Sequence, residues 1–142
     1  NILVKIEAQL ANASEALMLN DQGYVAEGSG DNIFIVKNGV VKTPPAYVGA
    51  LEGITRNTII EIGRKLGFDV REETMTRHDV YSADEVFLTG TAAEIISVVK
   101  VDGRVIGDGK PGEYTKKLLD AFREYVTTDG VKVYSETSVH AG

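Results

Sequence analysis

Asn32-Ile33-Phe34-Ile35-Val36-Lys37-Asn38-Gly39-Val40-Val41-Lys42-Thr43 is the stretch that decides the fold class. Two runs rich in β-branched and aromatic residues flank Asn38-Gly39, and both central positions of a type I′ turn need positive φ, which Asn and Gly accept most readily. The stretch therefore predicts an antiparallel hairpin, and Pro44-Pro45 ends its second strand.

Further short strands and helices surround this hairpin. Alternating or continuous apolar runs between turn residues predict strands at 15–19, 24–27, 68–73, 85–89, 95–101 and 104–106. Apolar residues at helical spacing predict helices at 55–66, 77–81 and 113–127. Hairpins mixed with helices favour an α/β (α+β) fold with a mixed sheet over a doubly wound parallel one.

The first ten residues follow a different pattern. Ile2, Ile6 and Leu10 recur at four-residue spacing, which predicts an amphipathic helix over 2–10. Asn1 would be its N-cap, or the chain would begin in the middle of a longer helix.

Length and composition narrow the class of protein. The 142 residues fit one domain, and 43% hydrophobic with 25% charged residues is ordinary for a soluble globular chain. No apolar run reaches the roughly 20 residues that span a bilayer, so we expect no membrane partner and a cytoplasmic protein. The net charge of −6 argues against a nucleic-acid partner, and the absence of Cys excludes disulfide and thiolate chemistry.

Three segments carry the candidate chemistry, and each has an ordinary structural explanation as well. Gly53-Ile54-Thr55 precedes a helix, so its N–H groups and the Thr55 hydroxyl could bind a phosphate, or Thr55 could be only an N-cap. Thr91 and Glu94 fit a capping box, although the same turn could present N–H groups to a second anion. Glu27 lies in a strand beside Gly28 and Gly30, and an isolated strand carboxylate usually faces solvent. The two glycines could serve turn geometry alone, or they could let another group approach the backbone closely.

Other candidates have less support. No grouping of His78 or His140 with carboxylates has metal-ligand spacing, so we expect no metal site. Ser29 has no base partner in a recognisable motif, and the glycines between 103 and 112 lack the strand-to-helix context of a dinucleotide loop.

Taken together, the segments 27–34, 51–56 and 89–95 resemble the branched-chain aminotransferases, which are class IV pyridoxal-phosphate transaminases. The similarity extends over about residues 2–134 and includes the intervening 42–45. It implies the large C-terminal domain of that fold, a mixed-sheet pseudo-barrel with flanking helices.

The resemblance also implies a role for individual residues toward the cofactor, pyridoxal phosphate. Glu27 would pair with the pyridine nitrogen, and Leu51 would pack on the ring. Ile54, Thr55 and Thr91 would hold the phosphate.

The substrate would lie against neighbouring residues of the same segments. Gly90, Thr91 and Ala92 would receive its α-carboxylate, with Gly30 close to the reacting face. The implied activity moves the amino group of leucine, isoleucine or valine to 2-oxoglutarate via pyridoxal phosphate, as in branched-chain amino-acid biosynthesis. Homodimers or larger homo-oligomers, with a smaller N-terminal domain packed on this one, are expected partners.

The Schiff-base lysine of the family would lie upstream of Asn1, and Lys5 does not match its position. No catalytic residue is therefore assigned within the chain. We interpret residues 1–142 as a single C-terminal cofactor-binding domain of a two-domain enzyme, inactive alone, with a flexible tail at 129–142.

Three alternatives remain at this point. D-amino-acid aminotransferases and aminodeoxychorismate lyases share the scaffold and differ around the turn at 90–93. The isolated chain could also be a non-catalytic anion-binding domain, with its motifs serving only as caps and turns.

Overall fold

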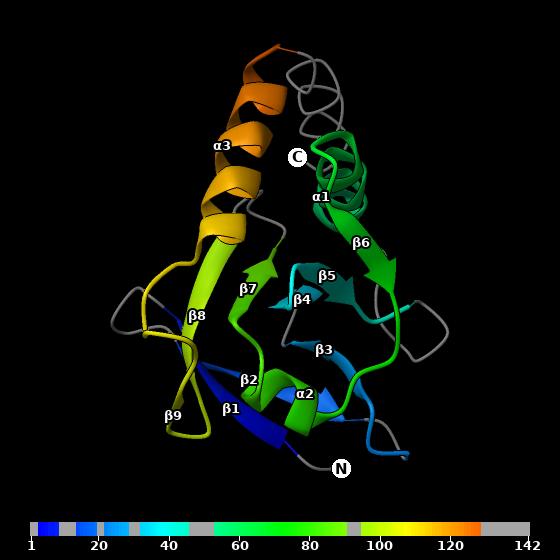
Figure 1. The fold of residues 1–142 in the computed structure, drawn as a ribbon. Helices are drawn as coiled ribbons and strands as arrows, with labels where there is room; N and C mark the ends of the chain where they lie inside the picture. Colours follow the sequence, from blue (N-terminus) through cyan, green and yellow to red (C-terminus); the bar gives the residue numbers. More distant parts are fainter. Residues whose placement is uncertain are drawn as a thin grey trace, which may run out of the picture.

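The computed structural model describes residues 3–8, 14–19, 22–28, 32–45, 53–90 and 95–128. These residues form a mixed sheet with flanking helices (Figure 1). The strands are β1 (Leu3–Ala8), β2 (Ser14–Leu19), β3 (Val25–Gly28), β4 (Asn32–Lys37), β5 (Val40–Thr43), β6 (Asp69–Glu72), β7 (Glu85–Thr89), β8 (Ile95–Val101) and β9 (Arg104–Val105). The helices are α1 (Ile54–Lys65), α2 (Arg77–Tyr81) and α3 (Glu113–Thr128).

The hairpin predicted from Asn38-Gly39 is confirmed. β4 and β5 pair antiparallel with Val36 opposite Val41, and the turn residues have φ of 51° and 78°. The strand–turn–strand pattern, with its special backbone conformation at the turn, was thus encoded locally.

The hydrogen-bonded strand order is β3-β2-β1-β8-β7-β4-β5-β6, with β9 paired to β8. Among the described strands only β5 and β6 pair parallel, since α1 crosses over between them. The sheet is therefore mixed, as the sequence predicts.

The sheet is curled so that its two ends approach each other. The Val25 N–H of β3 donates to the Met75 carbonyl beyond β6 (2.8 Å), and Tyr24 forms an isolated bridge with Thr76. Inside the curl, Val25 packs in one buried cluster with Ile33 of β4 and Val4 of β1. This closure gives the domain a barrel-like core.

The outer face of the central strands is covered by α1 and α3, which lie together at one end of the molecule (Figure 1). Phe34 and Phe87 stack there at 4.9 Å, and they pack in one buried cluster with Ile59 of α1 and Leu118 of α3. The two faces of β4 and β7 thus serve two separate cores, which explains their nearly continuous apolar sequence.

The helix predicted over 2–10 is wrong: residues 3–8 form β1, which pairs antiparallel with both β2 and β8. Four-residue spacing is also a multiple of the two-residue strand period, and Val4 and Ile6 are buried while Lys5 between them is exposed. The proposed cap at Asn1 lies outside the described residues.

The remaining predicted elements are confirmed with small shifts of their ends. α1 begins at Ile54, β6 occupies 69–72, and α3 extends to Thr128. The predicted tail at 129–142 lies outside the described residues. No helix in the described part of the chain is long and apolar enough to cross a membrane.

A carboxylate from β7 caps α3. The Glu85 Oε1 accepts from the Thr115 N–H (2.8 Å) and hydroxyl (2.7 Å), and Oε2 accepts from the Tyr114 N–H (3.1 Å). A Cβ on Gly112 would lie 2.0 Å from the Glu85 Cδ, so glycine is required for this approach. The carboxylate also lies at the positive end of the helix dipole.

We expect Glu85→Ala to lower the free energy of unfolding by about 1–3 kcal/mol, since three donors at the start of α3 lose their acceptor. Urea unfolding of the complete protein measures this loss. Glu61→Ala is the matched control, because the Glu61 carboxylate is exposed and pairs with Lys65 on the same helix, and such an exposed pair contributes about 0.5 kcal/mol or less. Equal losses in the two variants would contradict the capping role.

Candidate functional site

Parts of the three candidate segments meet where β4 begins, β7 ends and α1 begins. Asn32 and Thr89 are opposite each other in the antiparallel β4–β7 pair. They share the outer face with Phe34 and Phe87, because alternate residues of a strand point the same way. Gly53 lies against Asn32: a Cβ on Gly53 would be 2.8 Å from the Asn32 Oδ1. The start of α1 is therefore held directly over the end of the β4–β7 pair.

The first N–H groups of helix α1 have no acceptor within the helix. Its first helical bond runs from the Asn57 N–H to the Gly53 carbonyl (3.1 Å). The N–H groups of Ile54, Thr55 and Arg56 precede that bond and have no acceptor within the helix. The N-cap is Gly53, which contributes no side-chain hydrogen bond, and the first turn has no acidic residue. Such a terminus favours an external anion.

The other two described helices begin differently. Thr76 and Asp79 form a complete capping box at α2. α3 has Glu113 in its first turn in addition to the Glu85 carboxylate. Protein carboxylates therefore occupy the positive ends of α2 and α3, while the start of α1 has none in its first turn.

A buried cation strengthens the positive character of this terminus. Arg56, the third residue of α1, is 1% exposed. Its Nη2 donates to the Glu72 Oε1 (2.6 Å) and to the Pro44 carbonyl (3.1 Å), and its Nη1 donates to the Asn57 Oδ1 (2.8 Å). Its ion-pair partner Glu72 belongs to β6 and not to the first turn of α1.

Thr89 adds a hydroxyl that lacks a partner. It is 1% exposed, and its Oγ1 has no hydrogen-bond partner within the part of the chain that the structure describes. Buried hydroxyls are normally satisfied, so an unpaired one beside the start of α1 is typical of a site that receives a polar ligand.

The structure describes some of the predicted site residues. Thr55 is buried in the first turn of α1, Ile54 is exposed beside it, and Gly90 directly follows β7. Glu27 lies in β3 opposite Met18, next to a register shift in the β2–β3 pair. Such irregularities are over-represented near active sites. The side chain of Glu27, and all of Leu51, Gly30, Thr91 and Ala92, lie outside what the structure describes.

Two cap interpretations change. Thr55 is not the N-cap of α1, since Gly53 has that position and Thr55 is already helical. The capping box predicted at Thr91–Glu94 lies outside the described residues, and β8 begins immediately after it at Ile95, so no long helix follows.

Three residues of the site were missed by sequence reasoning. Asn32, Arg56 and Thr89 all belong to the three quoted segments, yet none was assigned a role. The position of Arg56 directly after Thr55 was the available signal, but its burial depends on Glu72, sixteen residues further along the chain.

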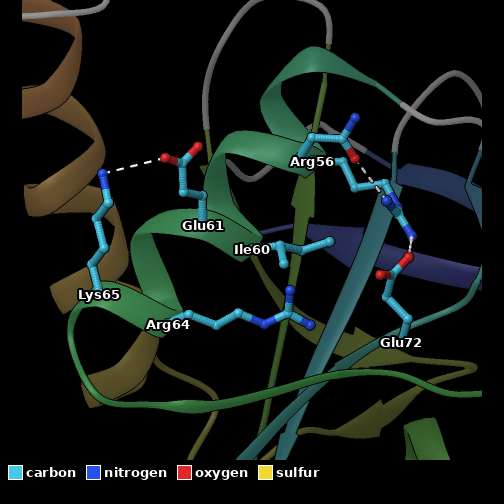
Figure 2. A pocket seen from close by; sticks show the side chains of 7 residues that line it. Arg56, Ile60, Glu61, Arg64, Lys65 and Glu72 are labelled. Atoms are coloured by element: carbon cyan, nitrogen blue, oxygen red, sulfur yellow. Dashed lines mark hydrogen bonds and ion pairs between the residues drawn. The ribbon is translucent and has the colours of Figure 1, made fainter.

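An open groove of about 480 Å³ runs along the flank of α1 and includes Arg56 (Figure 2). Its charged side chains are largely paired: Arg56 with Glu72, and Lys65 with Glu61. Arg64 donates to the Val70 carbonyl (3.2 Å). The groove therefore contains the acidic residues Glu61 and Glu72 among its basic ones, whereas the first turn of α1 has no acidic residue.

Tyr81 and Asp102, whose pKa values are shifted from their ordinary ones, lie away from the start of α1. The hydrogen bond with Asp102 raises the pKa of Tyr81, and the same bond lowers the pKa of Asp102, with help from the Lys5 N–H. This pair connects α2, β1 and the β8–β9 turn. It is structural, since it joins three elements and does not reach the start of α1.

The described residues fit a phosphorylated cofactor. The N–H groups of the first turn of α1 have no acceptor within the helix, Gly53 lets Asn32 approach that turn closely, and Asn32 is paired with Thr89, whose buried hydroxyl has no partner among the described residues. These are the features that bind a phosphate group at a helix N-terminus.

Comparison with known proteins assigns the family. The family model described as amino-transferase class IV matches residues 1–101. The putative branched-chain-amino-acid aminotransferase of Methanocaldococcus jannaschii is 54% identical over 136 residues, covering 96% of this chain and 47% of that protein. The chain belongs to the class IV aminotransferase family.

Solved structures agree with this assignment. The branched-chain amino acid aminotransferase from Escherichia coli matches with a TM-score of 0.74 and 49% identity, covering 76% of this chain and 37% of that one. The enzyme from Thermobaculum terrenum, in its PLP form, matches with a TM-score of 0.76 and 44% identity, covering 79% and 37%. The fold is therefore that of class IV aminotransferases, and the chain spans less than half the length of the curated relatives it matches.

Proposed function

We propose that the complete protein is a pyridoxal-phosphate-dependent aminotransferase that moves the amino group of leucine, isoleucine or valine to 2-oxoglutarate. The observation that carries the proposal is the meeting of Asn32, Thr89 and the N-terminus of α1, whose first turn has no acidic residue. The branched-chain names of relatives near 50% identity support the substrate class. The same names disfavour D-amino-acid aminotransferase and aminodeoxychorismate lyase.

Each segment has a defined task in this proposal. The N–H groups of Ile54 and Thr55, with the hydroxyls of Thr55 and Thr91, bind the phosphate, and Leu51 packs on the ring. When bound, pyridoxal phosphate supplies a protonated pyridine ring that accepts electron density as the Cα–H bond of the substrate breaks. The Glu27 carboxylate holds the proton at the pyridine nitrogen.

The substrate is oriented by the turn after β7. Gly90, Thr91 and Ala92 receive the α-carboxylate, and Gly30 leaves space at the reacting face. The residues that line the side-chain pocket belong partly to a smaller N-terminal domain, which we propose packs against this one in a cytoplasmic homodimer or larger homo-oligomer.

Steady-state kinetics of the complete protein test the substrate class. We expect kcat/KM for leucine, isoleucine and valine with 2-oxoglutarate to exceed that for D-alanine. A preference for D-alanine, or pyruvate release from aminodeoxychorismate, would contradict the proposal.

The lysine that binds the cofactor covalently is proposed to precede Asn1. Lys5 is unsuited, because it is an exposed residue of β1, which lies apart from the start of α1 in the strand order. Borohydride reduction of the complete protein with pyridoxal phosphate, followed by peptide mass mapping, is expected to label one lysine upstream of residue 1. Stoichiometric labelling of Lys5 or another lysine within residues 1–142 would show that the assignment is wrong.

A further inference from the structure

Arg56 occupies a position that is unfavourable for the helix by itself. A positive charge in the first turn repels the positive end of the helix dipole, and this guanidinium is also almost fully removed from water. A carboxylate or a neutral residue there would suit a helix that only has to fold. The arginine therefore needs a reason beyond the stability of α1.

Its hydrogen bonds connect the start of α1 to two other elements. The Arg56 Nη2 donates to both Glu72 on β6 and the Pro44 carbonyl just after β5. The Arg56 Nη1 donates to the side chain of the adjacent Asn57. Figure 2 shows the side chain pointing from α1 toward Glu72. The first turn is thereby fixed against the β5–β6 pair.

The two partners in the ion pair differ in exposure. The Arg56 side chain is 2% exposed and that of Glu72 is 39% exposed. The negative charge is thus partly screened by water at the groove, whereas the positive charge, carried by a first-turn residue of α1, stays buried. The buried guanidinium keeps the start of α1 electropositive, and its hydrogen bonds to Glu72 and Pro44 keep the first turn rigid.

We propose that Arg56 is a positioning residue for the phosphate of the cofactor, acting through the backbone of the first turn of α1. It holds the N–H groups of Ile54 and Thr55 in place and maintains the positive potential that attracts the phosphate. This inference rests on the proposed function and adds a residue that the resemblance did not assign.

The test compares two probes with the complete protein, pyridoxal phosphate and pyridoxal, which lacks the phosphate. Equilibrium dialysis gives the Kd of each probe for the unaltered protein, for Arg56→Met and for Arg56→Lys, and thermal melting monitors folding. Arg56→Met is expected to raise the Kd of pyridoxal phosphate at least about tenfold while that of pyridoxal changes less than about twofold. Arg56→Lys, which keeps the charge but cannot reach all three acceptors, is expected to give an intermediate loss of phosphate preference.

Glu61→Gln is the matched control, since it removes a carboxylate from the exposed flank of the same helix, where Glu61 pairs with Lys65. Its preference for pyridoxal phosphate over pyridoxal is expected to stay within about twofold of the unaltered protein. A merely structural role for Arg56 would lower the melting temperature and weaken both probes alike, which overturns the inference. If Arg56→Met does not fold, Arg56→Lys decides the test. A ratio of the two Kd values, pyridoxal phosphate to pyridoxal, that is unchanged in Arg56→Lys overturns the inference.

Failure of the proposed function itself has a different signature. An unaltered protein that does not bind pyridoxal phosphate overturns that function and this inference together. If the unaltered protein binds pyridoxal phosphate, and the Arg56 variants keep the same ratio of Kd values for pyridoxal phosphate and pyridoxal, only the inference about Arg56 is overturned.

Discussion

Glu27→Gln in the complete protein is expected to retain the cofactor and to slow transfer of the amino group about 100-fold or more. Glutamine nearly keeps the shape of the side chain and removes its charge, so the pyridine nitrogen loses the group that favours its protonated form. A 100-fold loss corresponds to about 2.7 kcal/mol of barrier, which fits removal of a preorganised charge from the transition state. Single-turnover absorbance measurements with leucine isolate the chemical half-reaction.

Glu7→Gln is the matched control for this prediction. Glu7 is another strand carboxylate, half-buried on β1, and it lies opposite Lys100 of β8. A strand carboxylate without a role in the chemistry changes stability by less than about 0.5 kcal/mol and leaves the rate nearly unaltered. A rate for Glu27→Gln within about twofold of the unaltered protein would exclude the proposed role of Glu27.

Thr55→Ala and Thr91→Ala are expected to weaken cofactor binding more than folding. Each removes a hydroxyl donor to a charged phosphate, and hydrogen bonds to charged groups contribute about 1.5–3 kcal/mol, or about 10- to 150-fold in Kd. For Thr55 the structure removes the competing explanation, because Gly53 is the N-cap of α1. Titration of the complete protein with pyridoxal phosphate and melting of its apo form separate the two effects.

The same helix offers a control for Thr55. Thr58 lies one turn later, and its hydroxyl donates to the Ile54 carbonyl (2.9 Å). Thr58→Ala is expected to leave the Kd of pyridoxal phosphate within about twofold. Similar losses of affinity in Thr55→Ala and Thr58→Ala would show that the effect comes from the stability of α1.

Local sequence signals predicted much of the fold. Asn38-Gly39 determined its hairpin because the turn needs positive φ at both residues, and the order of strands and helices from 32 onward required no long-range information. The failure at residues 3–8 arose because Ile2, Val4 and Ile6 fit a strand as well as Ile2, Ile6 and Leu10 fit a helix. The pairing of β1 with β2 and β8 makes this segment a strand and not a helix. The pattern of apolar residues within 2–10 does not contain that information.

The site was predicted as motifs, and its physical basis required tertiary contacts. The role of Gly53 depends on Asn32, and the burial of Arg56 depends on Glu72 and Pro44. The unpaired hydroxyl of Thr89 is visible only once β4 and β7 are side by side. Each of these contacts joins residues at least twelve positions apart, which spacing rules within one element do not cover.

A crystal structure of the complete protein with pyridoxal phosphate tests most directly whether the three segments form one cofactor site. We predict phosphate oxygens about 2.7–3.2 Å from the N–H nitrogens of Ile54 and Thr55, with a Glu27 carboxylate oxygen at a similar distance from the pyridine nitrogen. Cofactor bound elsewhere, with the start of α1 free of phosphate, would contradict the account.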